Sequence, residues 1–149
     1  MSAYRRILAA VDDSEAGAAG LREALRLAKS EAAELFIVHV VNEAPGYTPL
    51  AGPPPINLTQ ITVDAGRRLL ERAKDDAEKA GVRAETVLVE HADHGAAGGI
   101  LSQAGKLGAD LLVLGTHGRR GLTRALLGSD AEQVVRQAGA PVLLVRARP

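Results

Sequence analysis

Five short runs of aliphatic residues, separated by longer stretches with helical periodicity, are the feature that most constrains the fold of this chain. Each run is apolar almost throughout, as is typical of a strand buried on both faces of a sheet. The runs are residues 6–11, 34–41, 84–90, 110–114 and 141–145. The intervening stretches are too long for hairpins, so we expect parallel strands joined by crossing helices. The sequence therefore predicts an α/β fold, a single doubly wound five-stranded parallel sheet with helices on both faces.

The stretches between the runs carry apolar residues at spacings of three and four, which is the pattern of a helix packed along one side. Helices are expected over residues 15–29, 57–80 and 95–107, and from Ser129 to near Gly139. In the second helix the expected inward stripe is Leu58, Ile61, Ala65, Leu69, Ala73 and Ala77. The loop before that helix holds five prolines within residues 42–56, which predicts an extended, stiff segment.

Composition narrows the possible partners. The 149 residues suit one domain, taken as residues 1–149. Aromatic residues are 2% of the chain, too few for the stacking platforms that hold single-stranded nucleic acid. Eighteen basic residues balance eighteen acidic ones, so no strong field attracts DNA or an anionic membrane. The chain has no cysteine, no apolar run as long as a membrane span and no run resembling a signal peptide, so a cytoplasmic protein is expected.

A cluster of glycines follows the fourth aliphatic run. The run leads into Gly115-Thr116-His117-Gly118, and Gly128-Ser129 follows nine residues later, where the last helix is expected to begin. Ligands bind at this carboxyl edge of parallel sheets, and the unpaired N–H groups of a helix start attract anions. Positive charge in the same segment comes from His117, Arg119, Arg120 and Arg124. The pattern predicts a phosphate cradle.

Local structure alone could also explain these residues. Glycine after a strand is ordinary turn chemistry, and Ser129 with Glu132 has the spacing of a capping box. Asp12, Asp13 and Ser14 likewise offer caps for the first helix. The glycine spacing is neither that of a P-loop nor that of the dinucleotide fingerprint.

Histidines occur at two places where a ligand role is conceivable, at His39 and at His91 with His94. His39 lies inside an aliphatic run and is interpreted as a core or turn-facing residue. A second group consists of His91, Asp93 and His94, whose side chains are of types that bind metal ions. No fourth ligand is apparent, so we favour the interpretation that Asp93 or His94 caps the next helix.

The full pattern Gly115-x2-Gly118-x9-Gly128-Ser129 resembles the nucleotide-binding motif of the universal stress protein family. Residues 7–15, 39–40, 108–115 and 140–145 also resemble that family's strands. The resemblance implies a Rossmann-like sheet of strand order 3-2-1-4-5, as in the adenine nucleotide alpha hydrolase-like fold. The ends of strands one and four would then lie side by side, with Asp12 and Gly115 facing one crevice.

The resemblance implies that ATP is the ligand. The backbone N–H groups of Gly118, Gly128 and Ser129 and the Ser129 hydroxyl would hold the phosphates, beside Gly115 and Arg119. Asp12 and Val40 would contact the adenosine half, and Mg²⁺ or Mn²⁺ would be carried by the phosphates. The resemblance also implies a homodimer through antiparallel pairing of strand Val142–Val145, whose apolar residues would otherwise form an exposed edge.

Three functions remain open at this point. The first is a non-enzymatic ATP-binding stress protein, acting as a switch or scaffold for an unknown downstream protein partner. The second is a slow ATPase or phosphotransfer enzyme on the same site, although only His117 and Glu132 are candidate bases. The third is a structural dimer that binds no nucleotide.

Overall fold

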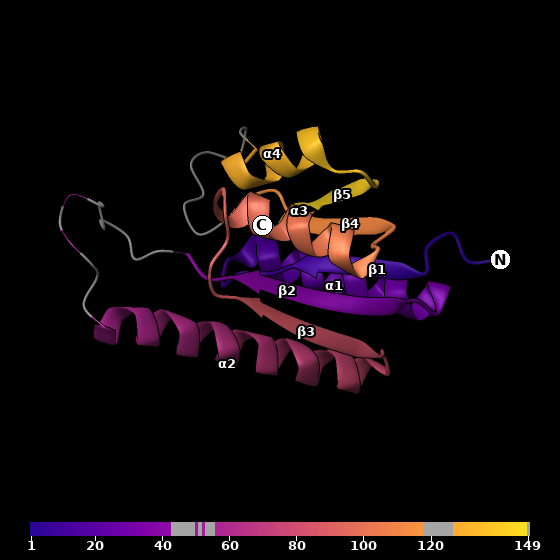
Figure 1. Cartoon of the computed structure of the whole chain (residues 1–149). Helices are drawn as coiled ribbons and strands as arrows, with labels where there is room; N and C mark the ends of the chain where they lie inside the picture. Colours follow the sequence, from indigo (N-terminus) through magenta and orange to yellow (C-terminus); the bar gives the residue numbers. More distant parts are fainter. Residues whose placement is uncertain (43–49, 51, 53–55, 118–126, 149) are drawn as a thin grey trace.

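The computed structural model describes residues 1–42, 50, 52, 56–117 and 127–148. Its strands are β1 (Arg6–Ala10), β2 (Glu34–Val40), β3 (Ala84–Val89), β4 (Leu111–Gly115) and β5 (Val142–Val145). Its helices are α1 (Glu15–Glu31), α2 (Ile56–Ala80), α3 (Gly95–Leu107) and α4 (Ser129–Gln137). All four strand pairs are parallel, and the order is β3-β2-β1-β4-β5 (Figure 1). The predicted fold class and strand order are confirmed.

The sheet separates two apolar layers. On one face, alternate residues of the central strands, such as Ile7 and Ile37, pack against α1 and α2. On the other face, residues such as Leu8 and Val38 pack against α3 and α4. Because β1 and β2 are buried on both faces, they have the continuous aliphatic sequence that predicted them. No helix in the described part of the chain is both long and apolar enough to cross a membrane.

The two edges of the sheet differ in sequence. β3 contains Glu85 and Thr86 among its six residues and none of its residues is fully buried, which suits a solvated edge and agrees with its predicted position. β5 is apolar throughout: Val142 and Leu144 pack toward α3 and α4, and Leu143 and Val145 pack toward α1. All four of these residues remain half-buried. The β5 edge therefore carries apolar side chains that the described fold does not fully cover.

The predicted inward stripe of α2 is partly wrong. Ala73 and Ala77 are buried as expected, but Leu58 is 37% exposed and Ile61 is 58% exposed. The stripe that faces the sheet is Val63, Gly66, Leu70, Ala73 and Ala77. A helix of 25 residues is about 37 Å long, whereas the six-residue strand β3 spans about 20 Å. The first turns of α2 therefore have no sheet beneath them (Figure 1).

Candidate functional site

The turn after β1 is held by a small network around Ser14. Ser14 is the N-cap of α1, and its Oγ accepts a hydrogen bond of 3.0 Å from the Gly17 amide. The Oδ1 atom of Asp12 accepts from the Ser14 amide at 3.0 Å and from the Ser14 hydroxyl. The helix is thus capped by Ser14, and the expectation that Asp12 or Asp13 could cap it is wrong for the N-cap position. Asp12 instead orients the capping residue.

Ser14 also connects the ends of β1 and β4. Its Oγ lies 3.3 Å from the carbonyl oxygen of His117, a second acceptor for the hydroxyl proton. The His117 ring lies beside Thr116, with 3.0 Å between Nδ1 and Oγ1. The other ring nitrogen, Nε2, is buried and has no hydrogen-bond partner among the residues described. Ser14 is one of the caps that the sequence offers for this helix, but its contact with the end of β4 has no signal in the sequence.

Gly115 is where α1 meets β4. A Cβ atom at this position would lie 2.6 Å from the Ala16 carbonyl carbon and 2.8 Å from the Gly17 nitrogen. A Cβ on Gly17 would in turn lie 2.3 Å from Oδ1 of Asp12. These are backbone and carboxylate atoms with little room to move. The first glycine of the motif is therefore used in close packing of α1 on β4, which places the Asp12–Ser14 turn.

The N-terminus of α4 has no side-chain cap. Its N-cap is Gly128, with φ −61° and ψ 149°, and Ser129 is the first helical residue, as the sequence predicted. The predicted capping box is wrong, because Ser129 does not occupy the N-cap. The Oε1 atom of Glu132 accepts a bond of 2.6 Å from Arg136, one turn later. The first amide groups of α4 therefore point out of the helix with no side chain of this turn bonded to them.

Two backbone bonds of Thr116 fix the end of β4, one to the end of β5 and one to the start of α4. The Thr116 amide donates to the Val145 carbonyl at 2.9 Å, and the Gly128 amide donates to the Thr116 carbonyl at 2.8 Å. Thr116 itself is buried. The start of α4 is thus held next to the end of β4, within one residue of His117. By way of the Ser14–His117 contact, it lies close to the Asp12–Ser14 turn.

The remaining predicted site residues fall into two groups. Val40 ends β2 at the same edge of the sheet, but its side chain is buried beneath α3, where a Cβ on Gly99 would lie 2.9 Å from it. Gly118 and Arg119 lie outside the described residues, as do Arg120, Arg124 and most of the proline-rich segment. The structure thus brings together Asp12, Gly115, Gly128 and Ser129, with the backbone end of Val40 nearby on the same edge.

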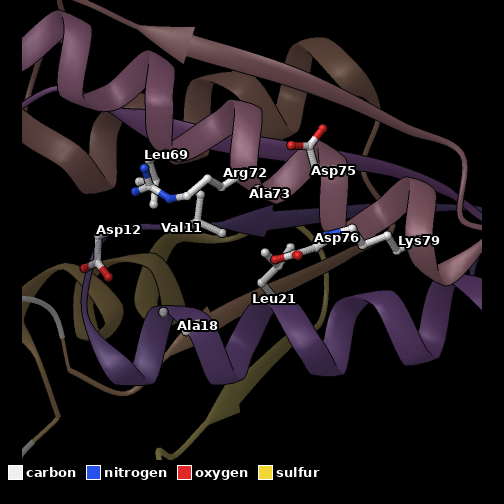
Figure 2. A pocket seen from close by; sticks show the side chains of 11 residues that line it. Val11, Asp12, Ala18, Leu21, Leu69, Arg72, Ala73, Asp75, Asp76 and Lys79 are labelled. Carbon is white, nitrogen blue, oxygen red and sulfur yellow. The ribbon is translucent and has the colours of Figure 1, made fainter.

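The turn that follows β1 also borders a groove between α1 and α2 (Figure 2). Its volume is about 370 Å³, with Val11, Leu21 and Ala73 among its apolar lining residues. Arg72, Asp76 and Lys79 line it from α2, and Asp12 lies at one end. The groove is on the α1–α2 face of the sheet, whereas α4 covers the opposite face. Asp12 therefore stands between this groove and the glycine-lined edge.

Metal-type side chains do not converge anywhere in the described ranges: no three His, Cys, Asp or Glu residues come together there. His94 occupies the N-cap position of α3 with φ 64°, and its side chain makes no capping bond, so the expected side-chain cap is absent.

The architecture is that of a doubly wound α/β protein with a polar cluster at the switch point, where connections leave β1 and β4 in opposite directions. The sequence pattern of the universal stress protein family matches residues 3–146. The chain belongs to this family.

Individual relatives agree with that assignment. The universal stress protein YxiE of Bacillus subtilis is 35% identical over 150 residues, covering 96% of this chain and 99% of YxiE. The structure of universal stress protein UspA from Lactobacillus plantarum is 26% identical, with a TM-score of 0.76 over 98% of this chain and 100% of that one. A universal stress protein solved in complex with cAMP is 25% identical, with a TM-score of 0.67 over 99% of this chain and 100% of that one.

Proposed function

We propose that this protein is a cytoplasmic, single-domain ATP-binding universal stress protein that acts as a nucleotide-dependent switch or scaffold for a downstream protein partner. The observation that carries the proposal is the juxtaposition of two different polar features at one edge. The Asp12–Ser14 turn is bonded to the end of β4, and the uncapped start of α4 is bonded to the same strand end. A nucleotide needs both an acceptor for its hydroxyls and donors for its phosphates.

The phosphates are assigned to the start of α4. Its first amide groups lack intrahelical acceptors, and the helix dipole favours an anion there. Asp130 and Glu132, however, add negative charge in the same turn. The proposal therefore includes Mg²⁺ or Mn²⁺ on the phosphates, together with Arg119. The described residues offer no cluster of three ligands for a metal, so the phosphate oxygens would supply most of its coordination.

The adenosine half is assigned to Asp12 and Val40. Within the part of the chain that the structure describes, Asp12 bonds to Ser14 through Oδ1, which leaves Oδ2 to accept a bond from a ribose hydroxyl or a base amine. Val40 would contribute through its backbone, because its side chain is buried beneath α3. Binding of cAMP by a relative of similar fold supports an adenine nucleotide.

Binding without turnover is the favoured activity. Glu132 is paired with Arg136, so it is poorly placed to activate a water. One observation favours the second candidate, a slow ATPase or phosphotransfer enzyme: the buried Nε2 of His117 has no partner among the described residues. Single-turnover measurement with Mg²⁺ separates the two. Turnover of about one per second or faster, lost in His117→Ala, would establish the enzyme.

Homodimerisation through β5 is part of the proposal. The edge is apolar on both faces and half-exposed, and such an edge invites antiparallel pairing across a two-fold axis. Sedimentation at micromolar concentration is expected to give a dimer. A monomer there would remove the dimer from the proposal and leave nucleotide binding to be judged separately.

The direct test is mass spectrometry of small molecules released on denaturing the purified protein, followed by titration with Mg-ATP. Gly128→Val and Gly118→Val are expected to abolish binding, because a branched side chain blocks the approach of phosphate to the backbone. Gly105→Ala in α3 is the matched control, since a Cβ there meets nothing within 4 Å. Absence of binding by the folded wild type would instead favour the third candidate, a structural dimer.

A further inference from the structure

His39 is a polar side chain in an apolar layer. It is only 7% exposed, and with Thr116 it makes up the buried polar residues of the described ranges. The residues that share its face of β2, Leu35 and Ile37, belong to the core under α1 and α2. An imidazole in such surroundings is unfavourable unless it is hydrogen-bonded. The hydrogen bond that His39 makes is therefore informative.

That bond holds the carbonyl group of Val11. Nδ1 of His39 lies 2.8 Å from the Val11 oxygen, and because a carbonyl can only accept, Nδ1 carries the proton. The Val11 amide donates to the Val38 carbonyl at 2.9 Å. A parallel ladder would continue with the next amide of β2 donating to Val11. The side chain of His39 makes this bond instead, one residue past the end of β1.

The Val11 carbonyl belongs to the peptide unit that ends at the Asp12 nitrogen. Its orientation therefore sets the direction in which the chain enters the turn. Asp12 in turn accepts two bonds from Ser14, and Ser14 caps α1 and meets the His117 carbonyl. A displaced Val11 carbonyl would move the start of this series of contacts.

The imidazole is held from its other side by α2. A Cβ on Gly66 would lie 2.9 Å from Cδ2 of His39 and 3.3 Å from Nε2. Gly66 is buried, so α2 sits directly against the ring. Glycine at this position lets the helix approach and confines the imidazole to the orientation in which Nδ1 faces Val11.

We propose that His39 is a positioning residue of the nucleotide site: clamped by Gly66, its Nδ1–H group holds the Val11 carbonyl and thereby sets the Asp12–Ser14 turn. The inference rests on the proposed function, since the turn is assigned to the adenosine half of ATP. His39 would lie one layer below the ligand, on a different strand from Asp12. It would act through Val11 and would not touch the nucleotide.

The first experiment separates the donor from the bulk of the side chain. His39→Asn keeps an N–H group near the place of Nδ1, whereas His39→Leu fills similar volume without a donor. We expect the Leu variant to bind Mg-ATP about tenfold more weakly, as befits one lost hydrogen bond, and the Asn variant to stay within about threefold of wild type. Calorimetric titration gives these affinities, and urea unfolding identifies variants that remain folded.

A readout that needs no nucleotide accompanies the titration. Hydrogen exchange at the Ser14 and Gly17 amides reports the turn and the cap directly. We expect faster exchange at both amides in His39→Leu and near wild-type exchange in His39→Asn. If the wild type does not bind Mg-ATP, the proposed function fails, but this exchange measurement still decides whether His39 sets the turn.

A second variant keeps the imidazole and disturbs its position. In Gly66→Ala the added methyl group presses on the ring, so exchange at Ser14 and Gly17 should rise and affinity should fall by about threefold, less than one full hydrogen bond. Gly105→Ala is the control in open space. The proposal is overturned if folded His39→Leu keeps wild-type exchange and affinity. It is also overturned if His39→Asn loses as much Mg-ATP affinity and amide protection as His39→Leu. Should His39→Leu fail to fold, unchanged exchange in Gly66→Ala overturns it.

Discussion

The helices α1 and α4 begin at the same edge of the sheet, after the adjacent strands β1 and β4, yet their first turns are built differently. At α1 the Ser14 hydroxyl accepts from the Gly17 amide, and Asp12 bonds to Ser14 in support. At α4 the N-cap is Gly128, and no side chain of the described residues caps the first amides. Among these residues, the start of α1 is capped by a side chain and the start of α4 is not.

This difference separates structural from binding roles within one motif. A capped turn has used its donors and resists movement, whereas an uncapped one offers donors to an external anion. Gly115 has a structural role at the start of α1, because its missing Cβ makes room for Ala16 and Gly17. Gly128 has the proposed binding role, at the uncapped start of α4. Three substitutions test this division, ordered by the expected change in the free energy of unfolding.

The largest effect is expected for Gly115→Ala. The new Cβ would lie 2.6 Å to 2.8 Å from backbone atoms of Ala16 and Gly17, which cannot rotate away. Overpacking of this kind should lower the free energy of unfolding by about 1–3 kcal/mol, measured by urea titration. Gly105→Ala, made in open space, should equal or exceed wild type by up to about 1 kcal/mol. Equal stability of the two variants would contradict the packing role of Gly115.

Ser14→Ala should come next. It removes the hydroxyl that caps α1 at the Gly17 amide and that has Asp12 and the His117 carbonyl as acceptors, so a loss of about 1–2 kcal/mol is expected in urea unfolding. Ser129→Ala is the matched control at α4. Because Ser129 is not the N-cap, its removal should change stability by less than about 0.5 kcal/mol. Similar losses at the two serines would remove the distinction between the two helix starts.

The smallest change in stability, and one of opposite sign, is expected for Gly128→Asp. A carboxylate at the N-cap would bond to the free amides of α4 and interact well with the helix dipole, adding about 0.5 kcal/mol. The same carboxylate would occupy the place assigned to phosphate and repel it. Mg-ATP affinity should therefore fall by more than tenfold while stability rises. Unchanged affinity in this variant would move the phosphate site away from α4.

The sequence predicted the sheet well because burial on both faces leaves a clear pattern. After the charged first residues Arg6 and Glu34, the strands β1, β2 and β4 have no polar side chain except His39, and the strand order follows from the confirmed family resemblance. The caps were less predictable. Ser14 and Ser129 each precede an acidic helical start, but only the backbone geometry places Ser14 at the N-cap and Ser129 one residue inside.

The stripe of α2 was mispredicted for a related reason. Counting apolar side chains favours Leu58, Ile61 and Ala65, because glycine contributes nothing to such a count. Yet Gly66 is the residue that faces His39, and the close approach there sets the rotation of the helix. The polar role of His39 was equally hidden, since its partner is a backbone carbonyl on another strand.

The backbone bond between the Gly128 amide and the Thr116 carbonyl has a consequence for the evolution of this protein. It joins the two ends of the segment that links β4 to α4, so the positions of strand and helix do not depend on what lies between. Side chains between the two ends can therefore be exchanged, and ligand preference can diverge among relatives, while the sheet and α4 keep their places.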